Sequence, residues 1–351
     1  MSSEQAKVFC VVPTNRPESL RRFLAEWEGK GGWDHLVVVE DVPALSKDRT
    51  EAVFDNWTEC PVSHYSHTEI RRELGDDAWI VSKQDSACRC FGFYAAWKAG
   101  ADYVLTLDDD CYPDHIPIVR QHLDRMSLEY RWVTSCPGLH VRGLPYRTMS
   151  GHQLPPAAVN VGLWSGVPDL DAKTQLTSWS GRSDFTPPPG SHSILPGQYV
   201  PVSGMNLMVA RRALPLFYFP LMGEGQPYRR FDDIWAGVIA KKVMDHLGMR
   251  LTVGEPFVRH ERASDSKVNL EKEAPGMLAN EHFWRVIDAV KLPGYYTQAN
   301  ECVGFVGRYL EDRLPKEVHA YPVPGFVPYL RQFGKALRVW ARLFAKEGGA
   351  A

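Results

Sequence analysis

The segment "YVLTLDDDCYPD" places three adjacent aspartates, Asp108, Asp109 and Asp110, directly after an apolar run. Carboxylates at the end of a buried strand are costly unless they are paired or bind a metal. An Asp-x-Asp pair at a strand end can hold a hard divalent cation, with one carboxylate binding the ion directly and the other orienting bound water or a sugar hydroxyl. We therefore predict a Mn²⁺ or Mg²⁺ site that Asp108 and Asp110 flank, with Asp110 as the direct ligand and substrate phosphates as co-ligands. The alternative is a solvated acidic turn, with Pro113 ending the strand.

Two other places carry residues suited to chemistry. Asp232 and Asp233 in "RRFDDIW" stand at the expected start of a helix, where acids are favoured by capping and by the helix dipole. Such carboxylates can also serve as a general base. His260 in "FVRH" follows an expected strand and is the candidate third metal ligand, although a lone histidine can equally be structural.

The elements around these residues alternate between strands and helices. Apolar strands are expected in "KVFCVVPT", "HLVVVED" and "DYVLTLDDD", with helical patterns in "RPESLRRFLAEWEGKGG" and "DSACRCFGFYAAWKAG" between them. This alternation predicts an α/β fold with a mostly parallel central sheet. Ligands of such sheets bind outside the carboxyl ends of the strands, which is where the polar residues of "PTNRP", "EDVP" and "DDDC" fall.

The second half of the chain differs in composition and predicted structure. We predict one domain over residues 1–325, with a Pro/Gly-rich, loop-rich insertion at 130–204, and a C-terminal basic amphipathic helix at 326–351. The apolar stripe of this helix can lie on an anionic membrane surface or dock on a partner; we favour the alternative that it packs on its own domain. The stripe consists of Leu330, Phe333, Leu337, Trp340 and Phe344.

Composition and missing motifs argue against several classes of protein. The net charge of −2 over 351 residues argues against a nucleic-acid partner held by phosphate neutralisation. Seven cysteines without a CxxC pair indicate reduced thiols in the cytoplasm and give no zinc signature. Neither a signal peptide nor a membrane-spanning apolar run is recognisable, so we expect a soluble protein. The GxSxG, P-loop and GxGxxG motifs are missing, which disfavours a covalent hydrolase and a bound flavin or nicotinamide.

Several blocks together resemble the reversibly glycosylated polypeptides, a family that includes the plant UDP-arabinopyranose mutases. The blocks are "DSACRCFGF", "VNVGLWSGVPDLDAKTQL", "GQPYRRFDDIWAG" and "FVRHERASDSKVNLEKE". The resemblance implies a glycosyltransferase-A-like fold, a UDP-sugar ligand and a metal-bound diphosphate. It also implies flavin-free interconversion of the pyranose and furanose forms of UDP-arabinose, with reversible self-glycosylation on an arginine. A homo-oligomer is possible. The alternatives are a glycosyltransferase with an external acceptor, using Asp232 or Asp233 as base, and a UDP-sugar-binding scaffold without turnover.

The resemblance assigns the glycosylated arginine, and the sequence itself offers candidate substrate contacts. The glycosylated arginine corresponds to Arg142 in "VRGLPYRTMSGH". Seven residues later the family has a second functional arginine; this chain has Met149 there, and the nearest arginine is Arg147. Arg89 is a candidate catalytic contact to the diphosphate or sugar, with a surface salt bridge as the alternative. Asp41 is the expected uracil or ribose contact, with turn capping as the alternative. The remaining residues assigned to substrate binding are Thr14, Asn15, Arg16, Asp85, Asp108 and Asp109.

Overall fold

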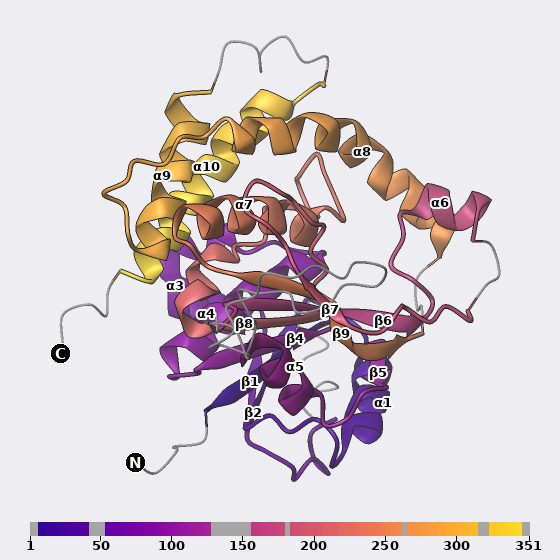
Figure 1. Cartoon of the computed structure of the whole chain (residues 1–351). Coiled ribbons are helices and arrows are strands. Elements are labelled where there is room, and N and C mark those ends of the chain that lie inside the picture. Colours follow the sequence, from indigo (N-terminus) through magenta and orange to yellow (C-terminus); the bar gives the residue numbers. More distant parts are fainter. Residues whose placement is uncertain are drawn as a thin grey trace, which may run out of the picture.

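The fold is a three-layer α/β arrangement around one nine-stranded sheet (Figure 1). The computed structural model describes residues 6–41, 53–127, 156–179, 183–261, 265–314 and 323–345. Along the sheet the strand order is β3-β2-β1-β4-β8-β6-β9-β5, and β7 pairs with β9. The strands are β1 (Val8–Thr14), β2 (His35–Glu40), β3 (Val62–Tyr65), β4 (Tyr103–Leu107), β5 (Cys111–Pro113), β6 (Val159–Gly166), β7 (Ser191–Ser193), β8 (Asn206–Ala210) and β9 (Leu251–His260).

The sheet is mixed, with most strands pointing the same way. β1 runs parallel to β2 and β4, β2 to β3, and β6 to β9, whereas β8 lies antiparallel between β4 and β6. The short strands β5 and β7 pair antiparallel to β9. The predicted α/β class with a largely parallel sheet is therefore confirmed. The glycosyltransferase-A-like arrangement that the resemblance implies fits this topology.

Helices cover both faces because the strands are apolar on both sides. In β1, Val8 and Cys10 face the layer that contains α1 and α5, while Phe9 and Val11 face the layer that contains α4 and α7 to α10 (Figure 1). This is the continuous apolar pattern of a strand buried on both faces. The helices are α1 (Pro17–Trp27), α3 (His67–Leu74), α4 (Arg89–Lys98), α5 (Ile118–Ser127), α6 (Ala172–Thr177), α7 (Asp232–His246), α8 (Ser266–Asp288), α9 (Ala299–Asp312) and α10 (Phe326–Leu343).

The region predicted as a loop-rich insertion contributes to the sheet itself. Within residues 130–204 the described part contains β6, which lies between β8 and β9, together with α6 and β7. The alternation of "VNVGLWSG" was hidden among prolines and glycines, so the sequence reasoning did not identify this strand. No helix in the described part of the chain combines the length and the apolar character that crossing a membrane requires.

The C-terminal helix α10 packs into the chain's own core. Its whole predicted apolar stripe is buried, and the indole Nε1 of Trp340 donates to the carbonyl oxygen of Pro215 at 2.9 Å. Gly307 of α9 and Gly334 of α10 let the two helices cross closely, because a Cβ on Gly307 would lie 2.7 Å from the Gly334 carbonyl oxygen. The structure therefore has the arrangement that we favoured, in which the stripe packs on its own domain. The basic residues Arg331, Lys335, Arg338 and Arg342 are exposed.

Candidate functional site

A cavity of about 260 Å³ lies at the carboxyl ends of the parallel strands β1, β2 and β4. Each of these strands ends in polar residues, so the edge of the sheet gathers charged groups from distant parts of the sequence. Nine of the predicted site residues line this one cavity: Thr14, Asn15, Arg16, Asp41, Asp85, Asp108, Asp109, Asp110 and His260. Arg89, Asp232 and Asp233 are not among its lining residues.

Asp109 joins the ends of β1 and β4. Its carboxylate accepts a hydrogen bond from the Thr14 hydroxyl at 2.7 Å and is ion-paired with the Arg16 guanidinium. Burial raises the pKa of Asp109 to about 6, although Arg16 and Thr14 oppose this shift. Thr14 and Arg16 thus fix the carboxylate of Asp109. Its neighbours Asp108 and Asp110 contact other groups.

Asp110 and His260 are brought together by strand pairing. Because β5 pairs with β9 so that Cys111 lies opposite His260, the preceding residue Asp110 places its Oδ1 atom 3.9 Å from His260 Nε2. The Nδ1 atom of His260 lies 2.7 Å from the carbonyl oxygen of Val167. A carbonyl oxygen only accepts, so Nδ1 carries the proton and, in the neutral ring, Nε2 presents its lone pair towards Asp110.

This pair fits part of a divalent metal site. Two donor atoms that each lie about 2.1 Å from one ion are roughly 3 to 4 Å apart, and the hydrogen bond from Nδ1 to a backbone carbonyl is typical of metal-binding histidines. The residues that the structure describes contain no group of three or more His, Cys, Asp or Glu side chains arranged to hold a metal. Mg²⁺ commonly takes only one or two protein ligands and completes its shell with water and substrate phosphates.

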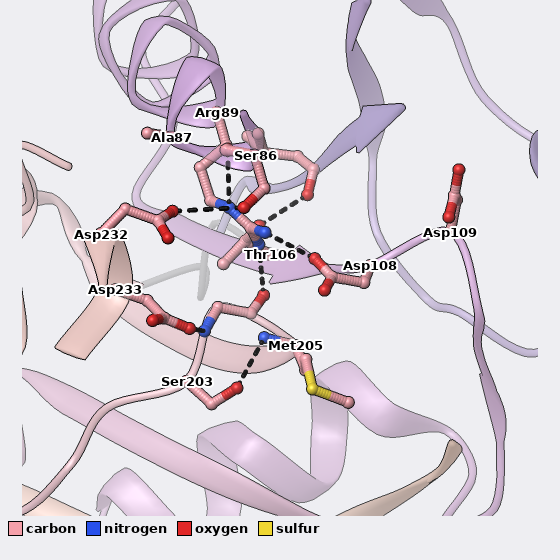
Figure 2. A network of polar contacts seen from close by, with 12 residues as sticks. Ser86, Ala87, Arg89, Thr106, Asp108, Asp109, Ser203, Met205, Asp232 and Asp233 are labelled. Atoms are coloured by element: carbon pink, nitrogen blue, oxygen red, sulfur yellow. Dashed lines mark hydrogen bonds and ion pairs between the residues drawn. The ribbon is translucent and has the colours of Figure 1, made fainter. Parts of the chain in front are cut away.

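Asp108 is turned towards a buried arginine rather than towards His260. Its Oδ1 atom accepts from Arg89 Nη2 at 2.6 Å, while Arg89 Nη1 donates to the Gly204 carbonyl oxygen at 2.6 Å (Figure 2). Arg89 is only 2% exposed. Burial disfavours its charge, but Asp108 and the acids of α7 outweigh that effect and raise the pKa of Arg89. Arg89 therefore lies behind the cavity wall and orients Asp108.

The acids at the start of α7 also do not line the cavity, and Figure 2 shows them in the polar network around Arg89. Asp232 accepts from the Ser86 hydroxyl at 3.3 Å, and Asp233 accepts from the Gly204 backbone N–H at 3.0 Å. Burial raises the pKa of Asp232 to about 7 and holds that of Asp233 well above its usual value. Asp232 can carry a proton near neutral pH, and the assignment of Asp232 or Asp233 as a general base stays a prediction.

Asp41 and Asp85 form the side of the cavity next to β2. The Oδ1 atom of Asp41 accepts from His67 Nε2 and from the Gln84 backbone N–H, both at 2.8 Å. Asp85 caps the short helix Ser86–Cys88 by accepting from the Ala87 N–H at 3.1 Å. Burial raises the pKa of Asp85 to about 6. This side of the cavity thus combines Asp41, whose carboxylate is held by two hydrogen bonds, with Asp85, whose pKa is about 6.

The family model described as reversibly glycosylated polypeptide matches residues 3–346. The chain belongs to this family. It is 34% identical over 345 residues to "Probable UDP-arabinopyranose mutase 1" of Solanum tuberosum, covering 94% of this chain and 88% of that protein. It is 32% identical to "UDP-arabinopyranose mutase 1" of Arabidopsis thaliana, covering 94% of this chain and 90% of that protein. The family predicted from the sequence blocks is confirmed.

Solved structures are matched at much lower identity. Glucosyl-3-phosphoglycerate synthase of Mycobacterium tuberculosis, in complex with Mn²⁺, UDP and glucosyl-3-phosphoglycerate, is 13% identical with a TM-score of 0.39, over 81% of this chain and 78% of that chain. TarS 1–349 of S. aureus, in complex with UDP, is 12% identical with a TM-score of 0.38, over 97% of this chain and 90% of that chain.

In this member of the reversibly glycosylated polypeptide family, the predicted glycosylation site Arg142 lies outside the described residues, as do Arg147 and Met149. Sequence reasoning missed several residues that line the cavity. All but Gln84 come from "VPDLDAKTQL", "QPYRRFDD" and "VNLEKE", which are inside the blocks that carry the family resemblance, so position within those blocks was the available signal. Gln84 directly precedes the block "DSACRCFGF". The missed charged and amide residues are Gln84, Asp169, Gln175, Arg229, Arg230 and Lys272.

Proposed function

We propose that this chain is a UDP-arabinopyranose mutase, which interconverts the pyranose and furanose forms of UDP-arabinose without a flavin. The observation that carries this proposal is the similarity along 94% of the chain to relatives bearing that name. The cavity supports it, because nine residues that the sequence analysis names as candidate metal or substrate contacts line it together. An enzyme of the mutase or glycosyltransferase type, acting on a UDP-sugar, follows from the same relatives.

In this proposal the UDP-sugar spans the cavity. The uridine lies beside Asp41, Thr14 and Asn15, and the diphosphate lies near Asp110 and His260. A Mn²⁺ or Mg²⁺ ion bound by Asp110 and His260 would neutralise charge on the diphosphate. Arg89 would keep Asp108 available at the edge of this site, since its guanidinium holds one of the two carboxylate oxygens.

The mutase reaction requires a proton to move between two sugar hydroxyls. When the pyranose opens, the former ring oxygen gains a proton, and the hydroxyl that closes the furanose loses one. Asp85 is suited to this exchange, because it lines the cavity and its carboxyl has a pKa of about 6. A group with such a pKa can give and accept a proton at neutral pH. Burial and the charge of Asp85 also raise the pKa of Asp232 to about 7.

A direct assay tests the function. The purified chain is incubated with UDP-arabinopyranose and Mn²⁺, and the products are resolved by chromatography. We expect UDP-arabinofuranose to accumulate to an equilibrium mixture that is also reached from the furanose side. Release of UDP only when an acceptor sugar is added would instead identify a glycosyltransferase. Binding without any turnover would contradict both enzymatic functions.

A cytoplasmic location belongs to the same proposal. The cysteines that the structure describes are all free thiols: Cys10, Cys60, Cys88, Cys90, Cys111 and Cys302. Reduced cysteines are typical of proteins kept in a glutathione-containing compartment.

A further inference from the structure

Three of the cations that line the cavity come from outside the strand ends. Arg229 and Arg230 belong to the segment before α7, and Lys272 belongs to α8. Arg230 is ion-paired with Glu273. Within the described parts of the chain, neither Arg229 nor Lys272 has an acidic partner within 4 Å. Two cations therefore stay unpaired in a cavity that also contains Asp85, Asp169 and Asp110.

The backbone that presents these cations is strained. Arg230 has a φ of 64° and Gln84 a φ of 56°, and these are the two non-glycine residues with positive φ in the described chain. Both line the cavity. Non-glycine residues adopt this conformation at a cost of about 1–3 kcal/mol, and they persist only where their surroundings hold them. Such positions cluster at ligand-binding sites.

The surroundings of Arg230 hold it on two sides. Arg230 Nε donates to Glu273 Oε1 at 2.8 Å, and the other oxygen of this buried carboxylate accepts from the Ala172 N–H at 2.7 Å. The loop before it is tied to the strained segment at Gln84, because the Glu224 N–H donates to the Lys83 carbonyl oxygen at 2.9 Å. The single bond at Nε leaves the terminal nitrogens of the Arg230 guanidinium able to donate to a ligand.

We propose that Arg229, Arg230 and Lys272 form a clamp for the diphosphate of the nucleotide sugar, in the cavity that Asp110 and His260 also line. The proposal rests on the function proposed above. Guanidinium groups bind phosphate oxygens in a bidentate manner, and an ammonium group adds a third charge. The clamp stabilises the negative charge that develops on the diphosphate as the anomeric bond breaks and the bonding electrons leave with UDP. It also makes the cavity selective for nucleoside diphosphates over nucleoside monophosphates.

Calorimetric titrations with UDP and with UMP, both in buffer containing Mn²⁺, test the clamp. The variants are Arg229→Gln and Lys272→Gln, and the matched control is Lys267→Gln. Lys267 is an exposed residue of the same helix that does not line the cavity. We expect each cavity variant to weaken UDP binding about tenfold, the magnitude of one charge-assisted hydrogen bond. UMP binding should change by less than about threefold, since UMP lacks the second phosphate.

The outcomes separate the clamp from the proposed function. Unchanged UDP affinity in both cavity variants would overturn the clamp, as would an equal loss of UDP and UMP affinity or an equal loss in Lys267→Gln. If the wild-type chain converts UDP-arabinopyranose while the variants bind UDP normally, the clamp fails and the mutase function stands. If UDP selectivity is lost as expected but no furanose is formed by the wild type, the clamp stands and the mutase function fails.

Discussion

The α9–α10 layer and the cavity use opposite means to place their residues. At the helix crossing, two glycines bring the backbones together, and the large side chains of α10 are covered by the core. At the cavity, Asp85 and Asp109 are buried, Arg229 and Lys272 have no acidic partner within 4 Å among the described residues, and Gln84 and Arg230 hold strained backbone conformations. The α9–α10 crossing therefore stabilises the fold, whereas the cavity lowers its stability. This is expected where a site must keep charged groups available for a ligand.

The largest effect should come from the helical layer. Trp340→Ala removes a side chain that is 1% exposed and packs against Tyr218 with ring centroids 5.4 Å apart. We expect the free energy of unfolding, measured with urea, to fall by about 3–5 kcal/mol. UDP affinity at low temperature should stay unchanged. Trp284→Ala, at a site that is 40% exposed on α8, is the control and should cost far less. A loss of UDP affinity without a loss of stability in Trp340→Ala would break the comparison.

The proposed metal ligand Asp110 should show the reverse behaviour. Asp110→Asn removes the charge that faces His260, so the increase in UDP affinity that Mn²⁺ produces should fall at least about tenfold. The unfolding free energy of the apo protein should barely change. Asp114→Asn, four residues along the chain and paired with Ser165, is the control. Unchanged Mn²⁺-dependent UDP binding in Asp110→Asn, measured by calorimetry, would place the metal elsewhere.

The buried acids give a smaller, pH-dependent effect. The pKa of Asp232 is raised by burial from 3.8 to about 7, so the folded protein holds a proton that the unfolded chain has released. The stability linked to this proton is complete below about pH 4 and is lost as the pH rises through 7. Asp232→Asn does not titrate, so its unfolding free energy relative to wild type should rise between pH 5 and pH 8. We expect a gain of at least about 1 kcal/mol; a relative loss over this range would contradict a raised pKa.

The smallest effect concerns backbone strain. Gln84→Gly should relieve the positive φ of 56°, which costs a non-glycine residue about 1–2 kcal/mol. The greater freedom of glycine in the unfolded chain offsets about 0.5–1 kcal/mol. We expect a net gain of roughly 0.5–1 kcal/mol in urea unfolding. Gln84→Ala keeps the strain and should give no such gain, so equal stabilities of the two variants would show that the conformation is unstrained.

The strand ends were predictable because their information is local. The apolar runs of β1, β2 and β4 each end in polar residues, and parallel strands bring their carboxyl ends to one edge. The residues Arg229 and Lys272 could not be derived in this way, because a loop and a helix bring them to the cavity only after the chain has folded. Arg89 shows a second limit. Its sequence context suggested a substrate contact or a surface ion pair, whereas the structure has it buried and paired with Asp108.

The position of α10 in the sequence has a consequence for how the protein is made. Every element that α10 covers, including the segment around Pro215 and Tyr218, is synthesised before it. During translation the sheet and its cavity residues therefore exist for a time before α10 covers its part of the apolar core, and exposed apolar surface of that kind favours aggregation. A ribosome-bound chain that stops before Phe326 should accordingly recruit more chaperone than a chain in which α10 has emerged and packed.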